Sequence, residues 1–344
     1  MTMNRRVYVV TKKKKKKKKL RKFILTPLIL LLLVGGTYAS SLYLKAEQVV
    51  NSSFESLDGS ELSAAVVDKT VKNISVLFIG IDDSETRTSM GATRSDALIL
   101  ATYNKEANSI KLVSIPRDSY VYVPETEEYT KINHAYAYGG AKATVETVEN
   151  LLDIDVDYYV RMNFYAFIDI VDALGGVTID VPYDLTEMDS SDMGTITLEA
   201  GTQKLDGEEA LAFARTRKMD NDMERGKRQQ ELIEAIISKA TSAQSLTKYS
   251  EVLEAIGDNM KTDLTFTQMK MYLSHFLTHT NLSVDSLQLE GNDSTIDDVY
   301  YYQLDEAKLA EMIDTLQAHL DGTLITEESE TAAEANLKKR LGHN

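Results

Sequence analysis

The sequence predicts an α/β fold in which a mixed β-sheet is flanked by helices on both faces, preceded by a single transmembrane helix. Short apolar runs that end at turn residues alternate along the chain with longer stretches of helical periodicity. Of the 344 residues, 43% are hydrophobic and 26% charged, a composition that can bury a core. One long uncharged segment near the N-terminus predicts the membrane helix.

The N-terminal segment differs in charge from the rest of the chain. Residues 1–22 contain twelve Lys and Arg residues and no acidic residue, whereas the whole chain has a net charge of −15. Residues 23–44 carry no charge and, at ~1.5 Å per residue, span roughly 33 Å as a helix, which is enough to cross a bilayer core. The basic flank predicts a single-pass cell-membrane protein with a cytoplasmic N-terminus and an extracellular C-terminal domain.

Two alternatives apply to this segment. A signal peptide cleaved near Ala39 also fits, although the apolar stretch of a signal peptide spans only roughly 7–15 residues. The Lys tract at residues 12–19 also fits nucleic-acid binding. Beside a membrane helix, such a tract is typical of a segment that fixes topology and contacts anionic lipids. We therefore expect anionic membrane lipids, and no nucleic acid, as its partner.

The chain beyond the membrane segment is predicted to have three parts: a stalk at residues 45–72, a catalytic domain at 73–322 and a polar tail at 323–344. Strands are predicted at residues 76–80, 97–102, 110–115 and 177–181. Helices are predicted after Gly139-Gly140, at residues 164–174, at 207–214 with Asp206 as N-cap, from Asp222 through Ile237, and at 309–320. A long loop is expected between Pro182 and Asp206.

Several classes of active site are excluded by residues or motifs that the chain lacks. The absence of Cys excludes disulfides, thiolate metal sites and a cysteine nucleophile. The chain contains no P-loop, no G-x-S-x-G motif and no H-E-x-x-H motif. His275 and His279 are four residues apart, but no Glu stands in the position that a zinc peptidase needs.

Four of the nine Arg residues beyond residue 44 lie between residues 215 and 228, namely Arg215, Arg217, Arg225 and Arg228. Arg in the first turn of a helix opposes the helix dipole, and a bound anion would reverse that penalty. Guanidinium groups also match phosphate oxygens two at a time. The cluster therefore indicates an anion site, or alternatively a solvated face that pairs with neighbouring acidic residues.

Carboxylates stand at the ends of two predicted strands. Asp82 and Asp83 follow the first strand, and Asp96 precedes the second. Ligands of open α/β sheets gather at the carboxyl ends of the strands, and two carboxylates there suit Mg²⁺. The alternative is turn capping. Arg117, just past another strand, is a further phosphate ligand or an ion-pair partner of Asp118.

Seven short motifs occur in a characteristic order between residues 77 and 230. They are residues 77–82 (LFIGID), 93–96 (TRSD), 114–118 (SIPRD), 131–136 (KINHAY), 172–177 (DALGGV), 214–217 (ARTR) and 222–230 (DMERGKRQQ). In this order the sequence resembles the LytR–CpsA–Psr family of Gram-positive cell-wall enzymes. The resemblance implies a phosphotransferase that attaches a polyprenyl-pyrophosphate-linked glycopolymer, such as wall teichoic acid or capsule, to peptidoglycan through a phosphodiester.

The same resemblance implies roles for individual residues. Asp82 and Asp96 are implied as ligands of Mg²⁺, with Mn²⁺ as the alternative metal. The pyrophosphate-binding set is implied to be Arg94, Arg117, Arg215, Arg217, Arg225 and Gln229. Asp222 is a candidate for the group that accepts the acceptor's proton. The family often has Arg two residues after the first Asp, where this chain has Ser84, so the later Arg87 is not assigned to the site.

The lipid tail of such a substrate requires an apolar tunnel between the helices and the sheet. Phe164, Phe167, Ile168 and Leu232 are candidates for its walls, or alternatively ordinary core residues. A hydrolase that cleaves the same lipid pyrophosphate with water is an alternative function, because the two reactions differ only in the acceptor. A membrane-tethered regulatory protein or transcriptional attenuator is a further alternative.

Overall fold

The structure is a computed structural model that describes residues 40–41, 43–59, 70–82, 93–216, 222–240, 252, 259–279 and 282–323. The chain divides into two compact units, residues 1–47 and residues 48–344. Most of the predicted membrane segment, and the tail beyond residue 323, lie outside the described residues. Within the described part of the chain, no helix combines the length and the apolar character that a bilayer crossing requires. In the larger unit, Phe54 of the predicted stalk packs on the domain, because it forms a parallel bridge with Thr262.

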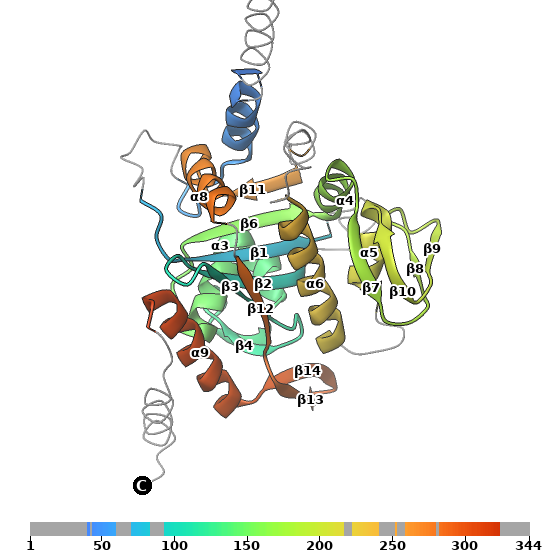
Figure 1. The fold of residues 1–344 in the computed structure, drawn as a ribbon. Helices are drawn as coiled ribbons and strands as arrows, with labels where there is room; N and C mark the ends of the chain where they lie inside the picture. Colours follow the sequence, from blue (N-terminus) through green and yellow to red (C-terminus); the bar gives the residue numbers. More distant parts are fainter. Residues whose placement is uncertain are drawn as a thin grey trace, which may run out of the picture. The chain divides into compact units, whose positions relative to one another are not determined.

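A six-stranded sheet with the order β11-β6-β1-β2-β3-β12 forms the centre of the larger unit (Figure 1). Its strands are β1 (Ile74–Ile81), β2 (Ser95–Asn104), β3 (Ser109–Ser114), β6 (Tyr158–Asn163), β11 (Met260–Thr262) and β12 (Ser283–Gln288). Strands β1, β3, β6 and β12 run in one direction, and β2 and β11 run in the other. The sheet is therefore mixed, which confirms the predicted fold class.

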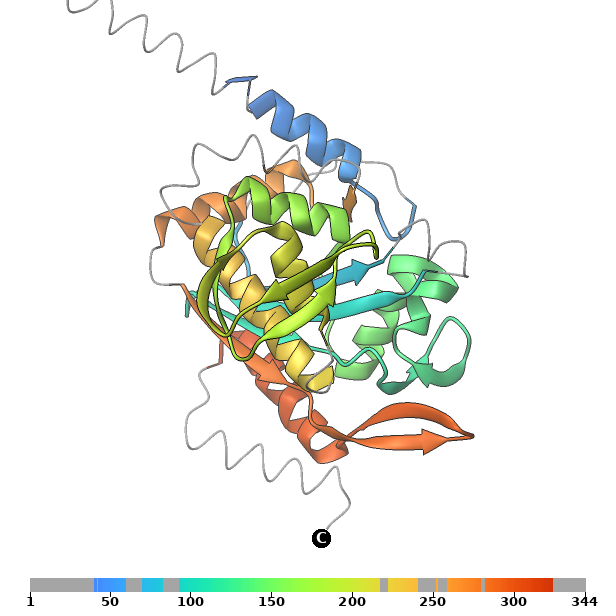
Figure 2. The ribbon, with the colours of Figure 1, turned by 90° about the vertical axis from the view of Figure 1, so that its right-hand side faces the viewer.

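Helices cover both faces of this sheet, and Figure 2 shows its strands between α6 and α3. Leu77 and Leu100 point to one face, where they pack in a core with α3 (His134–Leu152) and α9 (Glu306–Asp321). Ile99 and Leu112 point to the other face, towards α6 (Asp222–Ala240) and α8 (Phe266–Thr278). The alternation follows from the two-residue period of a strand.

A smaller lobe packs against α6 and has its own core around Val171, Phe213 and Leu232. It consists of α4 (Phe164–Ala173), β7 (Val177–Val181), β8 (Leu185–Met188), β9 (Thr195–Leu198), β10 (Gly201–Leu205) and α5 (Gly207–Arg215). The prediction of a long loop before Asp206 was wrong, because three short strands lie there. In β8 and β9 only Leu185 and Leu198 are buried, so the apolar signal of these strands is weak.

The helix ends follow the local chemistry of the sequence. Asp206 caps α5 in a capping box with Glu209, as predicted. Gly175, with φ of 80°, follows the end of α4 in a conformation that favours glycine. Helix α3 starts at His134, earlier than predicted, and is interrupted where Gly140 adopts a φ of 65°. The predicted helix therefore follows the two glycines, and a shorter helical segment from His134 precedes them across a kink.

Helix α9 is fixed to the sheet through a buried histidine. The Nδ1 atom of His319 lies 2.8 Å from Thr102 Oγ1, and Nε2 lies 2.8 Å from Ser109 Oγ. Burial lowers the pKa of His319 to about 4, so the ring is neutral at neutral pH. Two hairpins complete the fold: β4 (Tyr120–Val123) with β5 (Glu128–Lys131), and β13 (Gly291–Ile296) with β14 (Val299–Leu304).

Candidate active site

Polar side chains from several strands meet at one edge of the central sheet. Because β1, β3 and β6 run in the same direction, their carboxyl ends lie at this edge. Asp82 follows β1, Arg117 comes shortly after β3, and Asn163 is the last residue of β6. Strand β2 starts there and contributes Asp96. Gly80 pairs with Ala97 and Ile81 with Ser95, so Asp96 is the extra residue of a β-bulge. Of these residues, the structure brings Arg117 and Asp96 into direct contact.

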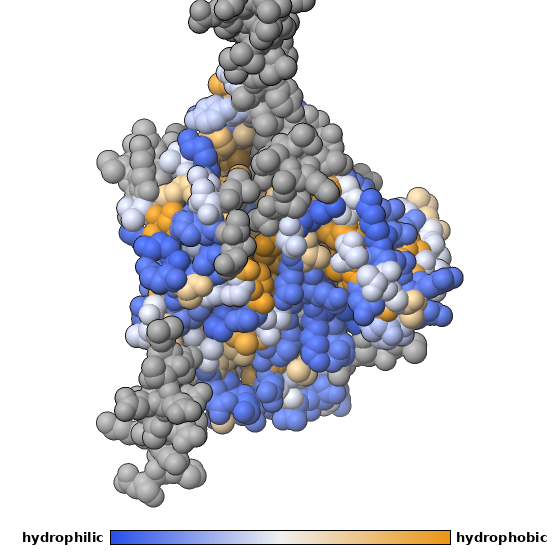
Figure 3. Space-filling model, viewed as in Figure 1, coloured by the Kyte–Doolittle hydropathy of each residue, from blue (hydrophilic) through white to orange (hydrophobic). Residues whose placement is uncertain are grey.

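A cavity of about 630 Å³ extends from this edge between the sheet, α4, α5 and α6. Most of its wall is apolar, and in Figure 3 apolar side chains are visible among hydrophilic ones near α4 and the upper part of α6. The apolar lining includes Phe78, Ile99, Phe164, Phe167, Ile170, Leu211, Leu232 and Ile236. The polar lining consists of Asp96, Arg117, Asn163, Glu187, Arg215, Arg225 and Gln229. An amphiphilic ligand with an anionic head suits such a cavity.

Three of the four predicted tunnel residues line this cavity, and one does not. Phe164, Phe167 and Leu232 are in its wall. Ile168 is buried and faces α5, where a Cβ atom added to Gly207 would lie 2.7 Å from its Cγ2 atom. Ile168 is therefore a packing residue between α4 and α5, which agrees with the core interpretation of this residue.

Arg117 is held at the cavity by carboxylates on two sides. Its Nη1 atom donates a hydrogen bond to Asp96 Oδ1, and its Nε atom lies 3.7 Å from Asp118 Oδ2. Lys131 Nζ lies 2.9 Å from the other oxygen of Asp118. Arg117 therefore both lines the cavity and pairs with Asp118. A role as phosphate ligand and a role as ion-pair partner of Asp118, the two alternatives from the sequence, are compatible. These pairs fix the orientation of the guanidinium group before a ligand binds.

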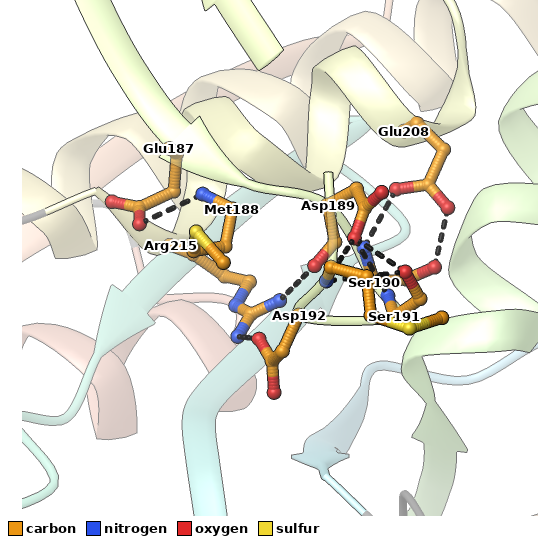
Figure 4. A network of polar contacts seen from close by, with 9 residues as sticks. Glu187, Met188, Asp189, Ser190, Ser191, Asp192, Glu208 and Arg215 are labelled. Carbon is orange, nitrogen blue, oxygen red and sulfur yellow. Dashed lines mark hydrogen bonds and ion pairs between the residues drawn. The ribbon is translucent and has the colours of Figure 1, made fainter. Parts of the chain in front are cut away.

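Arg215, the last residue of α5, reaches the cavity from the smaller lobe (Figure 4). Its Nη1 atom lies 3.5 Å from the carbonyl oxygen of Asp189, and Nη2 lies 3.5 Å from Asp192 Oδ1. The guanidinium carbon is 5.0 Å from the ring centre of Phe164. Contacts as long as 3.5 Å are weak, so a phosphate can replace them at small cost.

The loop that contacts Arg215 is itself well organised (Figure 4). Asp189 accepts hydrogen bonds from the Ser191 hydroxyl at 2.7 Å and from two backbone N–H groups, which hold the pKa of its carboxyl below the usual value. The Ser190 backbone N–H donates to Glu208 Oε2 at 3.0 Å, which ties the loop to the first turn of α5. The loop therefore contacts α5 at its first turn, through Glu208, and at its last residue, Arg215.

Helix α6 contributes residues of two kinds. Arg225 and Gln229 line the cavity. Arg228, only 4% exposed, instead donates to the Phe213 carbonyl at 3.0 Å, the Thr216 carbonyl at 2.5 Å and the Tyr183 hydroxyl at 3.1 Å. Arg228 thus joins α6 to the end of α5, and the predicted arginine cluster is divided between a site role and a structural role.

Gly226 explains how the first turns of α6 come close to the sheet edge. A Cβ atom added to Gly226 would lie 2.6 Å from Ser114 Oγ, at the carboxyl end of β3. A larger residue would require the Ser114 side chain or the helix to shift. The close approach brings the positive end of the α6 dipole to the edge that carries Arg117, which favours an anion there.

The remaining predicted residues are placed as follows. Asp82 is buried at the end of β1 and is not part of the cavity lining. Arg94 is exposed, precedes β2 and does not line the cavity. The pKa of His134 is lowered mainly by burial of its ring and secondly by the positive charge of Arg94. Arg217, Arg87 and the Asp222 side chain lie outside the described residues. Asn163 and Glu187 line the cavity but were not predicted from the sequence.

The donor set at the sheet edge fits the predicted metal. Among the described residues, no group of three or more His, Asp or Glu side chains is suited to hold a metal ion. Mg²⁺ needs only one or two protein carboxylates when phosphate and water oxygens complete its shell. Asp82 and Asp96 stand at the ends of neighbouring strands and supply two such carboxylates. The metal remains a prediction with a compatible set of ligands.

Comparison with known proteins identifies the family. Residues 40–318 match the sequence model of the LytR_cpsA_psr family. The chain belongs to the LytR–CpsA–Psr family. Among its relatives in this family is the polyisoprenyl-teichoic acid–peptidoglycan teichoic acid transferase TagT of Bacillus subtilis, 40% identical over 291 residues that cover 83% of this chain and 89% of TagT.

Solved structures of TagT share the fold of this LytR–CpsA–Psr protein. TagT bound to LIIa-WTA is 39% identical with a TM-score of 0.62, and the match covers 75% of this chain and 95% of that chain. TagT with bound octaprenyl pyrophosphate lipid is 36% identical with a TM-score of 0.58, and the match covers the same 75% and 95%. These structures show that a relative with this fold binds an octaprenyl pyrophosphate lipid.

Proposed function

We propose that this LytR–CpsA–Psr protein transfers a glycopolymer, such as wall teichoic acid or a capsule-like polymer, from a polyprenyl pyrophosphate carrier to peptidoglycan. The observation that carries the proposal is the cavity with apolar walls and the guanidinium groups of Arg117, Arg215 and Arg225 in its lining. Its relative TagT is named as a teichoic acid transferase and has been seen with octaprenyl pyrophosphate. The shape and chemistry of the cavity suit the same class of donor.

The donor is bound in two parts. The polyprenyl chain packs against apolar residues such as Phe167 and Leu232, which removes hydrocarbon from water. The pyrophosphate lies against Arg117, Arg215, Arg225 and Gln229, where the apolar surroundings strengthen each charge-assisted hydrogen bond. Arg94 and Arg217 extend this set in the proposal.

In the transfer, a hydroxyl oxygen of peptidoglycan attacks the phosphorus atom that carries the glycopolymer. A P–O bond to peptidoglycan forms as the P–O bond to the bridging oxygen breaks, and polyprenyl monophosphate leaves. The hydroxyl proton goes to a base, for which we propose Asp222, the first residue of α6. Negative charge grows on the non-bridging and leaving oxygens, and the arginines stabilise it most in the transition state.

Asp82 and Asp96 are the residues that would hold Mg²⁺ or Mn²⁺ in this site. A bound divalent ion would neutralise charge on the pyrophosphate oxygens. Arg117 orients the Asp96 carboxylate at the sheet edge through its hydrogen bond to Oδ1. We further propose that residues 23–44 anchor the protein in the membrane with the domain outside the cell, where peptidoglycan and the lipid carrier meet.

Transfer and hydrolysis can be distinguished by whether the polymer becomes joined to peptidoglycan or is released. The full-length protein in detergent is mixed with labelled lipid-linked glycopolymer, Mg²⁺ and peptidoglycan glycan strands. We expect polymer joined to the strands, together with polyprenyl monophosphate. Release of free polymer phosphate without any joined product would contradict transfer and support a lipid pyrophosphate hydrolase.

A further inference from the structure

Two hairpins that are far apart in sequence bring tyrosine rings together on the surface. Four of these rings, those of Tyr120, Tyr122, Tyr129 and Tyr301, contact one another, and Tyr300 adjoins them through Lys131, whose Nζ atom lies near the rings of both Tyr300 and Tyr301. We call the five tyrosines the tyrosine platform. The ring centres of Tyr120 and Tyr129 are 5.5 Å apart, as are those of Tyr122 and Tyr129, and Tyr120 lies 4.9 Å from Tyr301. Tyr129 is 62% exposed and Tyr300 41% exposed, so the cluster presents aromatic surface to solvent.

The platform is rigid because the two hairpins are joined to each other. Ser119 and Tyr302 form a parallel bridge, and the backbone N–H of Tyr302 donates to the Asp118 carbonyl at 2.9 Å. Tyr302 itself is buried. The Tyr300 hydroxyl donates to Asp293 Oδ1 at 2.8 Å across the β13–β14 hairpin. A preorganised set of rings loses little conformational entropy when a ligand stacks on it.

The platform adjoins the polar part of the cavity through a chain of charged contacts. Lys131 Nζ lies 5.5 Å from the ring centre of Tyr300 and 5.7 Å from that of Tyr301. The same nitrogen pairs with Asp118, which also neighbours the Nε atom of Arg117 in the cavity wall. None of the five tyrosines lines the cavity itself. A ligand on the platform would therefore approach Arg117 without entering the apolar cavity.

The turns of both hairpins carry acidic residues. Glu125 and Glu127 lie between β4 and β5, and Asp297 and Asp298 lie between β13 and β14. Their charge repels a polyanionic chain such as a phosphate-rich glycopolymer, and also an anionic membrane surface. The rings therefore favour a ligand that is uncharged along its backbone, and pyranose sugars offer apolar C–H faces that stack on aromatic rings.

We propose that the tyrosine platform binds the sugar backbone of the peptidoglycan acceptor and presents its hydroxyl groups to the site at Arg117. The proposal rests on the transferase function proposed above and adds the surface on which the acceptor lies. Sugar rings stack on Tyr129 and Tyr300, and hydroxyl and acetamido groups meet the phenol oxygens and Lys131. Acceptor and donor then reach Arg117 from separate surfaces.

The test compares acceptor and donor dependence of the transfer reaction. Glycan strands that keep their stem peptides, so that the lactyl carboxyl groups of the sugar backbone stay amidated and uncharged, serve as acceptor. The full-length protein in detergent is compared with the Tyr129→Ala/Tyr300→Ala variant and the single Tyr129→Ala variant. We expect the acceptor concentration for half-maximal rate to rise about tenfold in the double variant, equivalent to about 1.4 kcal/mol. The donor concentration for half-maximal rate should change by less than about twofold. Tyr165→Ala on α4, at a position that is 46% exposed, is the matched control and should alter neither.

Two results would contradict the proposal that the tyrosine platform binds the acceptor. One is an unchanged acceptor dependence in both variants while the wild-type protein forms joined product. The other is an equal rise in donor and acceptor requirements, which would indicate a general disturbance or another occupant of the surface. If the wild-type protein forms no joined product at all, the proposed transferase function fails, and that outcome is distinct from both.

Discussion

Replacing Arg117 with Met is expected to lower kcat/KM for transfer by about 10³-fold. The side chain lines the cavity and is oriented by Asp96 and Asp118, so its guanidinium group is in place before charge develops on the pyrophosphate. Arg117→Lys keeps the charge but loses the planar fork, and we expect it to recover only a small part of the rate. Steady-state rates with lipid-linked glycopolymer and glycan strands measure both effects.

The matched control for Arg117 is a second cation–carboxylate pair on the same sheet. Lys111 Nζ on β3 lies 3.2 Å from Asp285 Oδ2 on β12 and does not line the cavity. Lys111→Met should leave the transfer rate within about twofold of wild type, because an exposed pair contributes little. Equal losses in Arg117→Met and Lys111→Met would show that the Arg117 effect is not specific to the site.

Replacing Arg228 with Met is expected to destabilise the domain by about 3–5 kcal/mol and lower Tm by on the order of 10 °C. The substitution leaves the carbonyl oxygens of Phe213 and Thr216 and the Tyr183 hydroxyl without their buried donor. Each such loss costs roughly 1–3 kcal/mol. Thermal unfolding followed by circular dichroism measures the shift.

Arg225, three residues earlier on α6, provides the contrast. It is 5% exposed, nearly the same as Arg228, but it lines the cavity. We expect Arg225→Met to abolish measurable transfer while Tm moves by no more than about 3 °C, since residues kept for function add little stability. If both variants lost stability equally and kept proportional activity, the division of α6 into site and structural arginines would be wrong.

The sequence was sufficient to predict the parts of the fold that have strong local signals. The apolar runs of β1, β2 and β3 and the Asp206 cap of α5 were confirmed. The contact between Asp96 and Arg117 was not predicted, because the two residues are 21 positions apart and only the pairing of β2 with β3 brings them together. The lipid substrate implied by the family resemblance made Phe164, Phe167 and Leu232 candidates for a tunnel wall, with ordinary core as the alternative, and all three line the cavity.

Other features depend on tertiary contacts that local sequence does not encode. Arg225 and Arg228 differ by about 60° around α6, and only the position of α5 decides which one faces the cavity. Asn163 caps α4 through Ala166 N at 3.0 Å, so in sequence it is an ordinary N-cap. Gly226 carried a usable signal, because a glycine inside a helical pattern often marks a close approach.

The central claim is that the cavity holds a polyprenyl chain with its phosphate groups on the arginines. The most direct measurement is mass spectrometry of lipids that remain bound to the full-length protein after extraction in detergent. We predict a polyprenyl phosphate or pyrophosphate on the wild-type protein, and its loss when Ile170→Trp fills the cavity from α4. Tyr165→Trp, an exposed position on the same helix, should retain it. Wild-type protein free of such lipids, or equal lipid on the Ile170→Trp variant, would contradict the account.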